Sequence, residues 1–103
     1  MPQLMYYEPQ SIPDGSYINA MEASCSDDVL FNITFDSSTT WHYHNGKTWQ
    51  ETSTTSDGMN SVALKNITPV TWSEICTNST AYQVRCILSS AKSYVNTLRV
   101  GHN

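Results

Sequence analysis

Hydrophobic and polar residues alternate most regularly in two stretches of the chain. From 29 to 35 every second side chain is apolar, which predicts a strand with one buried face and with Asn32 and Thr34 on the opposite face. The same period over 82–88 predicts a second strand, and a final strand is expected at about 94–100. We expect these last two strands to pair with each other in an antiparallel sheet.

A hairpin is predicted over 39–51. Asn45-Gly46 lies between two β-prone runs, and this dipeptide favours a two-residue type I′ turn because both of its residues must adopt positive φ. Such a turn places His42 opposite Trp49. It also divides the aromatic and histidine side chains between two faces, with Trp41 and Tyr43 on one face and His42, His44 and Trp49 on the other. We expect one of these sets to be exposed or to be covered by another element.

One short helix is predicted at 68–76. Thr68 is a suitable N-cap, Pro69 suits the first helical position, and apolar residues follow at helical spacing. The preceding polar stretch, 51–60, is expected to be a connection, and 61–64 a short strand.

These elements predict an all-β fold, an antiparallel β-sandwich of jelly-roll or immunoglobulin-like shape with one short helix at 68–76. The sandwich domain is expected to span 29–103. Residues 1–28 are irregular in pattern, with three prolines and a turn signal at Pro13-Asp14-Gly15, and we expect them to form an extended N-terminal arm.

Composition narrows the classes of function. The chain has 103 residues, only 14% of them charged, and a formal net charge of −4. The five Lys and Arg residues are spread along the chain, which argues against a phosphate-binding patch, and we expect no nucleic-acid partner. No stretch approaches the roughly 18 apolar residues of a membrane span, and no signal peptide is recognisable. We expect a product made in the cytoplasm, with no membrane partner.

The cysteines leave two interpretations open. Cys25, Cys76 and Cys86 include no Cys-x-x-Cys pair, so we expect free thiols that pack as small hydrophobic groups. A Cys76–Cys86 bridge is the alternative in an oxidising compartment. The bridged form would suit a different kind of protein, a secreted receptor-type domain. Such a domain could be glycosylated at the triplets that begin at Asn32, Asn66 and Asn78.

Aromatic and histidine side chains supply the candidate binding sites. Trp41, Tyr43 and Trp49 could form a platform on which sugar rings stack, although packing in the core explains the same residues. Trp72 is expected to fill the core. His42 and His44 point the same way on one strand and could hold a metal, with surface polarity as the alternative.

Catalytic chemistry has little support. Asp27, Asp28 and Asp36 flank one predicted strand, but its length separates them, and we interpret them as turn and edge residues. The sequence contains no nucleophile elbow, metalloprotease helix or phosphate-binding glycine loop. We therefore expect no enzyme activity and no cofactor.

A pattern of spaced aromatic and apolar residues runs through the predicted elements. It consists of Phe35-Asp36, Trp41, Trp49, Gly58-Met59, Ile67-Thr68, Trp72, Tyr82, Val84-Arg85, Leu88, Val95, Leu98 and Val100. This pattern and the order of the elements resemble small β-sandwich modules of bacteriophage virion and tail proteins and of some bacterial surface proteins.

The resemblance implies a structural and adhesive component of a phage virion, either a capsid decoration or a tail-associated protein. Its expected partners are other virion proteins and copies of itself, with a host surface glycan as a further candidate. The alternative function is a carbohydrate-binding module that uses Trp41, Tyr43 and Trp49.

Overall fold

Strand β7 (Ala81–Leu88) lies inside the larger of two sheets, with neighbours on both sides. In the computed structural model, which describes residues 2–103, the order of this sheet is β1-β7-β4-β5-β6, and the short β2 also pairs with β7. The other strands of this sheet are β1 (Gln3–Tyr6), β2 (Gln10–Ser11), β4 (Val29–Thr34), β5 (Trp41–His44) and β6 (Trp49–Thr52).

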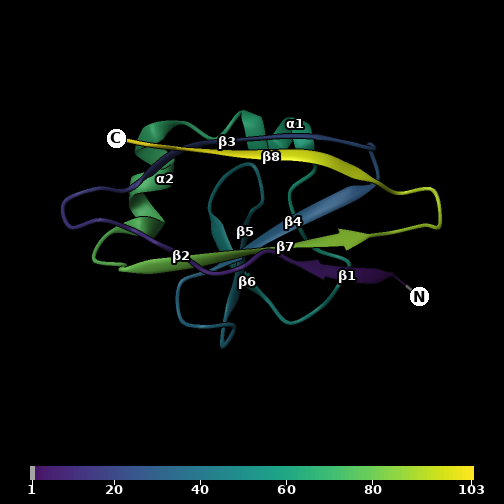
Figure 1. The fold of residues 1–103 in the computed structure, drawn as a ribbon, viewed down its shortest axis with the longest axis horizontal. Helices are drawn as coiled ribbons and strands as arrows, with labels where there is room; N and C mark the ends of the chain where they lie inside the picture. The colour runs from purple at the N-terminus through teal and green to yellow at the C-terminus, as the bar shows by residue number, and fades with distance from the viewer. Residues whose placement is uncertain (1) are drawn as a thin grey trace.

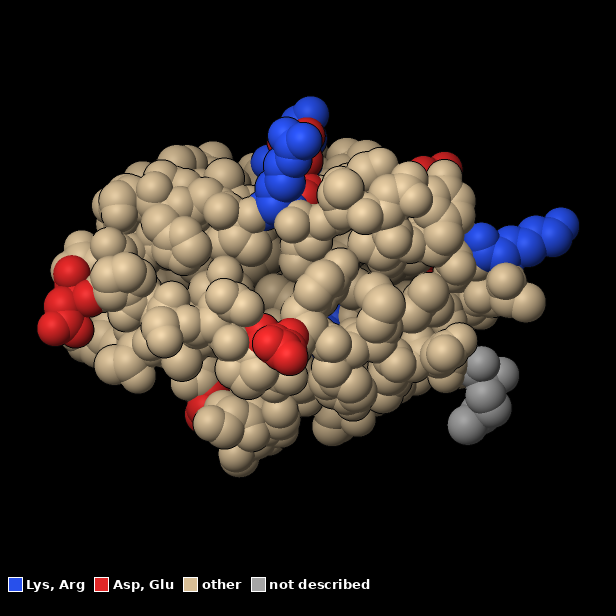
Figure 2. Space-filling view, in the orientation of Figure 1, with Lys and Arg blue, Asp and Glu red and all other residues tan. Residues whose placement is uncertain are grey.

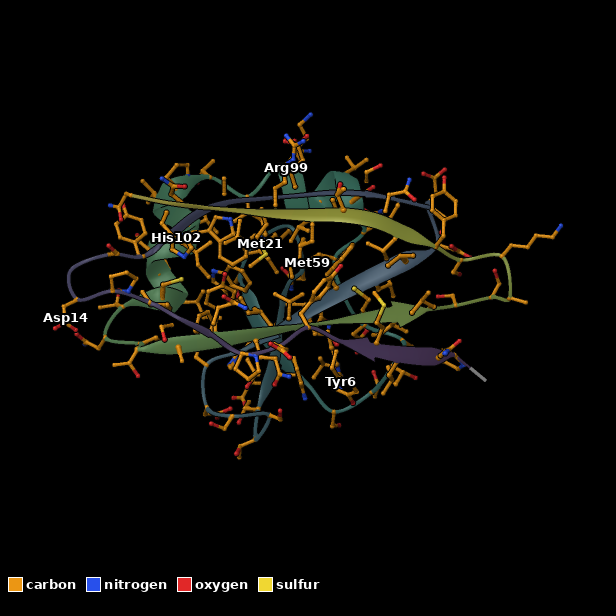
Figure 3. The ribbon with its side chains drawn as sticks, in the orientation of Figure 1. Tyr6, Asp14, Met21, Met59, Arg99 and His102 are labelled. Carbon is orange, nitrogen blue, oxygen red and sulfur yellow. The ribbon has the colours of Figure 1, made fainter. Side chains whose placement is uncertain are left out.

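The second layer contains a two-stranded antiparallel sheet and both helices (Figure 1). Its strands are β3 (Ile18–Cys25) and β8 (Val95–His102), and α1 (Ser61–Lys65) and α2 (Pro69–Cys76) pack against β3. The core fills the space between the layers, where Figure 3 shows Met21 and Met59. The fully buried side chains there include Trp72, Phe31, Ile18, Ile33, Met59 and Leu64.

This architecture confirms the predicted fold class, an all-β antiparallel sandwich with short helical structure. The strands predicted at 29–35, 82–88 and 94–100 correspond to β4, β7 and β8. The predicted helix corresponds to α2, and the Thr68 hydroxyl caps it by accepting a hydrogen bond from the Thr71 backbone N–H at 3.2 Å.

The predicted N-terminal arm is wrong as a separate segment. Strands β1 and β2 pair with β7, and β3 pairs with β8 along its whole length, so the boundary expected at residue 28 divides neither the sheets nor the core. Ile18 and Met21 are both buried although they are three residues apart. An irregularity in pairing between Ile18 and Ala20 turns them to the same side, which removes the period-two pattern that marks a strand. Met1, the first residue of the predicted arm, lies outside the described residues.

Two further expectations about the sheets are wrong. Strand β8 does not pair with β7, since the chain crosses from one layer to the other between them. At this crossing the Asp28 carboxylate accepts hydrogen bonds from the hydroxyls of Ser90 and Ser93, each at 2.8 Å. Residues 61–64 are helical rather than extended, because the Asn60 side chain accepts a hydrogen bond from the Ala63 N–H and caps α1.

The hairpin forms, but with a longer loop than predicted. Trp49 pairs with His44 rather than with His42, and four residues connect the strands. The Asn45 side chain accepts hydrogen bonds from the N–H groups of Lys47 and Thr48, both at 2.9 Å, and this closes the wider loop. A shift of two residues leaves every side chain on its predicted face.

The second face of β4 is buried, contrary to expectation. Asn32 and Thr34 have no exposed surface, because Trp41 and Arg85 lie on the same side of the sheet and the 53–58 loop packs over it. The larger sheet is therefore covered on both faces at its centre.

Charged groups are sparse on the surface. In the view of Figure 2, Lys and Arg side chains lie beside Asp or Glu side chains at the top of the molecule, and the few other charged side chains are scattered over an otherwise uncharged face. The cysteines are free thiols, with Cys25 half-buried and Cys76 and Cys86 buried. Among residues 2–103 no helix is both long and apolar enough to cross a bilayer.

Candidate functional site

Trp41 of the predicted aromatic platform covers a buried cation. The guanidinium carbon of Arg85 lies 4.5 Å from the centre of the Trp41 ring, which is a cation–π contact. Trp41 is only 8% exposed, and Tyr6 of strand β1 packs against it with ring centres 5.9 Å apart. Its ring is thus engaged within the protein and presents little surface to a ligand.

Arg85 is held by neutral oxygen atoms. It is 7% exposed, and its Nε donates to Asn32 Oδ1 at 2.9 Å while Nη2 donates to the Thr54 carbonyl at 3.3 Å. Asn32 in turn donates from Nδ2 to the Asp57 carbonyl at 3.0 Å. This network ties the polar 53–58 loop to the outer face of the sheet. It also buries Asn32, so this residue cannot accept a glycan in the folded protein.

Trp49 lies on the opposite face of the hairpin. Its Nε1–H donates to the Thr71 carbonyl at 2.9 Å, and its ring packs on Trp72 of α2 with centres 5.2 Å apart. Tyr43, on the Trp41 side, is half-buried against the core cluster. The structure therefore does not bring the three predicted platform residues onto one surface, because the hairpin separates Trp49 from the other two.

The predicted metal ligands share the Trp49 face. His44 stacks edge-on against Trp49 at 5.2 Å, and its Nδ1 accepts a hydrogen bond from the Gly46 N–H at 3.2 Å. His42 Nδ1 is buried without a hydrogen-bond partner. Within residues 2–103 no group of three or more His, Cys, Asp or Glu side chains is arranged to hold a metal. Metal binding by the two histidines stays a prediction.

Two of the acidic residues considered in the sequence analysis, Asp28 and Asp36, stabilise turns through hydrogen bonds. Hydrogen bonds from the Ser90 and Ser93 hydroxyls lower the pKa of Asp28. The Thr34 hydroxyl and the Thr40 backbone N–H do the same to the pKa of Asp36, at 2.7 and 2.8 Å from its Oδ1. Each carboxylate thereby fixes the end of a strand.

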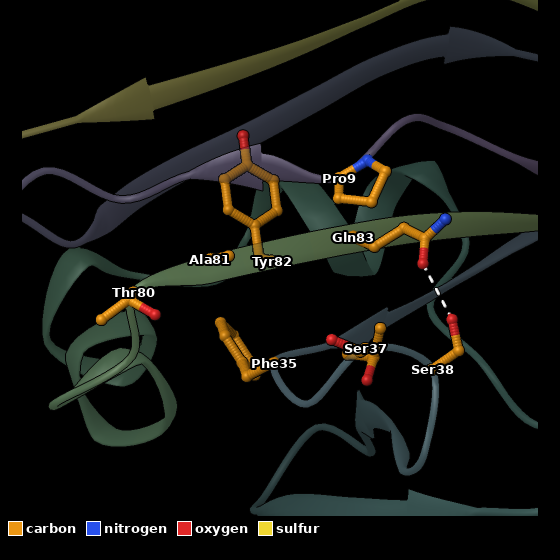
Figure 4. Close-up of a pocket in the computed structure, with 9 residues that line it drawn as sticks. Pro9, Phe35, Ser37, Ser38, Thr80, Ala81, Tyr82 and Gln83 are labelled. Carbon is orange, nitrogen blue, oxygen red and sulfur yellow. Dashed lines mark hydrogen bonds between the residues drawn. The ribbon is translucent and has the colours of Figure 1, made fainter.

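A pocket that the sequence did not indicate opens where β4 ends (Figure 4). Its volume is about 270 Å³, and it lies between the turn after β4 and the start of β7. Phe35 lies between Thr80 on one side and Ser37 and Ser38 on the other. The remaining lining residues are Pro9, Thr34, Ala81, Tyr82 and Gln83.

The turn beside this pocket has an unusual backbone. Ser37 and Ser38 have φ of 60° and 72°, and the Thr39 N–H donates to the Asp36 carbonyl at 3.3 Å. Two consecutive positive φ values are the signature of a type I′ turn, whose preferred residues are Asn and Gly. Each serine costs roughly 1 kcal/mol or more in this conformation. The strained turn holds both serines at the rim of the pocket.

Hydrogen bonds fix one end of the pocket and leave other groups available. Ser38 Oγ donates to Gln83 Oε1 at 2.9 Å, and Gln83 Nε2 donates to the Tyr7 carbonyl at 2.9 Å. The hydroxyls of Ser37 and Thr80 have no hydrogen-bond partner among residues 2–103. The pocket thus combines a fixed amide with two free hydroxyls.

A second, larger depression lies along the open side of the sandwich. It measures about 540 Å³ and separates the edge of β8 from the segment that follows β1. Its apolar lining comes from Val84, Leu98 and Val100, with Glu8 and His102 among the polar residues. The three lining residues from β8, Leu98, Val100 and His102, are alternate residues of that strand and so lie on one of its faces.

Comparison of the chain with protein-family models, with curated proteins and with solved structures finds no match. The function must therefore be argued from these surfaces.

The sequence signal for the pocket was weak. Phe35 belongs to the apolar face of the strand predicted at 29–35, and Ser37 and Ser38 follow it closely in the sequence. Nothing in this local pattern shows that the start of β7 lies across from them.

Proposed function

We propose that this chain is a non-enzymatic structural and adhesive component of a phage virion that acts through protein–protein contacts, including contacts with copies of itself. The observation that supports this proposal is the open edge of β8. In the described part of the chain, the only strand neighbour of β8 is β3.

This edge has few of the features that prevent strand addition. Natural edge strands are often short or carry lysine or proline, which block pairing with another chain. Strand β8 has eight residues, contains neither lysine nor proline, and carries one charged residue, Arg99. Arg99 is opposite Glu22 of β3, which offsets its charge. The edge of β8 is therefore suited to pairing with a strand of a second copy.

The virion setting rests on the resemblance found in the sequence. Most of the hydrophobic residues that carry it pack in or against the core, among them Trp72, Tyr82 and Val84. They support the sandwich scaffold, whereas the exposed strand edge supplies the contact surface for assembly.

Self-association is tested by sedimentation velocity over a range of protein concentrations. We expect the native chain to form oligomers. Thr97→Lys, which places a positive charge on an exposed position of β8, should shift it toward monomer. Thr55→Lys makes the same change in the exposed 53–58 loop and should leave association unchanged.

The virion setting is tested by mass spectrometry of particles banded in a density gradient from the native source. We expect the chain at a fixed copy number per particle, at its unmodified mass. Absence from particles together with a monomeric chain would contradict the proposal. Removing residues 1–28 is not a suitable test, because it deletes three strands.

A further inference from the structure

We propose that the pocket beside the Ser37-Ser38 turn binds a single neutral sugar ring. This site is distinct from the aromatic hairpin, and it lies between the end of β4 and the start of β7 (Figure 4). The proposal does not depend on virion assembly, because binding at this pocket needs only one copy of the chain.

The size and shape of the pocket fit one ring. Small-molecule sites usually measure about 300–1,000 Å³, and a pocket of about 270 Å³ lies just below that range, which suits a ligand of one ring. Phe35 contributes a flat aromatic side chain between two hydroxyl-bearing ends. A sugar ring has a face of C–H groups that stacks on an aromatic ring and a rim of hydroxyls that need polar partners. In the pocket, the Phe35 ring can receive the C–H face, and the hydroxyl-bearing side chains on either side of it can receive the sugar hydroxyls.

The chemistry of the lining favours a neutral ligand. None of the nine lining residues is charged, so the pocket offers no ion-pair partner for a phosphate, a carboxylate or an amine. The hydroxyls of Ser37 and Thr80 can each donate one hydrogen bond and accept others. Ser38 and Gln83 are already oriented by their mutual hydrogen bond at 2.9 Å and retain acceptor capacity. Such a set of donors and acceptors is complementary to the hydroxyls of a sugar.

The turn itself supplies a second, independent argument. Asn-Gly would adopt the two positive φ values with less strain, yet serines occupy both positions. Strained backbone that carries available polar groups is a feature of ligand sites, where the geometry is fixed before the ligand arrives. The strain at Ser37 and Ser38 holds their hydroxyls beside Phe35.

The test is a titration of ¹⁵N-labelled protein, followed by amide chemical shifts, with the methyl glycosides of glucose, galactose, mannose and N-acetylglucosamine. We expect at least one of them to shift the amides of 34–38 and 80–83 at millimolar concentration. Thr80→Val removes one free hydroxyl without changing the shape of the side chain. It should weaken binding about two- to tenfold, the value of one hydrogen bond.

Thr55→Val is the matched control, because Thr55 is also exposed and lies outside the pocket. It should bind as the native chain does. A double substitution of Ser37→Asn with Ser38→Gly relieves the turn and removes both hydroxyls. We expect it to raise the melting temperature while abolishing the shifts.

Four results would overturn the proposal. The first is the absence of shifts with all four glycosides. The second is shifts centred on Trp41 or Trp49 instead of the pocket. The third is binding that Thr80→Val and the double substitution leave intact. Binding of N-acetyltyrosine amide in place of the sugars would likewise reject the sugar and assign the pocket to a peptide side chain.

Discussion

Asn32→Leu is predicted to destabilise the fold strongly although it opens little space. Leucine has the branching and the number of side-chain heavy atoms of asparagine, with bulkier methyl groups in place of the amide oxygen and nitrogen, so the substitution leaves no cavity and removes the hydrogen bonds. Asn32 accepts from the buried Arg85 Nε at 2.9 Å and donates to the Asp57 carbonyl at 3.0 Å. With Asn32 gone, Arg85 keeps its hydrogen bond to the Thr54 carbonyl but loses its closest acceptor.

The magnitude follows from these two bonds. A hydrogen bond to a charged group contributes about 1.5–3 kcal/mol, and a neutral one about 0.5–1.5 kcal/mol. We therefore expect the free energy of unfolding to fall by about 2–4 kcal/mol. In a domain of about 100 residues, this corresponds to a decrease in Tm of roughly 10–25 °C.

The assay is urea unfolding followed by tryptophan fluorescence, with Asn96→Leu as the matched control. Asn96 is exposed on β8, and its substitution should change stability by no more than about 0.5 kcal/mol. Combining Asn32→Leu with Arg85→Met removes both partners. The double variant should lose less stability than the sum of the single variants, by about 1–3 kcal/mol. A loss below about 1 kcal/mol for Asn32→Leu, or strict additivity in the double variant, would refute the reasoning.

Three further predictions concern other contacts. Trp49→Ala removes the ring that packs on Trp72 and should lower the free energy of unfolding by about 2 kcal/mol, as measured by thermal melting. An unchanged Tm would instead mean that the Trp49 ring is free to bind a ligand. Asp28 has a pKa below its ordinary value of 3.8, so the stability it contributes is present above that pH and is lost as the pH falls through the lowered pKa. Asp28→Asn should therefore flatten the acid limb of a melting series, and parallel curves would contradict this. Burial raises the pKa of Cys86 to about 12, and Cys25 is only half-buried. Iodoacetamide should therefore label Cys25 before Cys86, and peptide mapping would show the order. Equal labelling of the two thiols in the native state would contradict this prediction.

The sequence predicted the elements whose local pattern agrees with their final environment. The uninterrupted alternation of 29–35 and 82–88 identified β4 and β7, and the Thr68-Pro69 pair identified the start of α2. Strand β3 was missed because its pairing irregularity places Ile18 and Met21 on one side at an odd spacing.

The contacts made by polar residues were harder to predict. The alternation of apolar and polar residues over 29–35 placed Asn32 on the solvent face, but the 53–58 loop and Arg85 cover it. The sequence of a polar loop does not indicate which surface the loop packs against. The turn rules also selected the wrong dipeptide. Positive φ at two consecutive residues occurs at Ser37-Ser38, where the Asp36 carboxylate holds the turn, rather than at Asn45-Gly46. The candidate pocket depends on that turn, so it could not have been predicted.

The pairing of strands far apart in the sequence has a consequence for synthesis. Strand β1 pairs with β7 and strand β3 with β8, and both partners follow all the other strands in the chain. A ribosome therefore releases β1 to β6 and both helices before either of these pairings can form. Such distant pairing slows folding. We expect chains cut short before β8 to be captured by chaperones or proteases rather than to persist as partly folded domains.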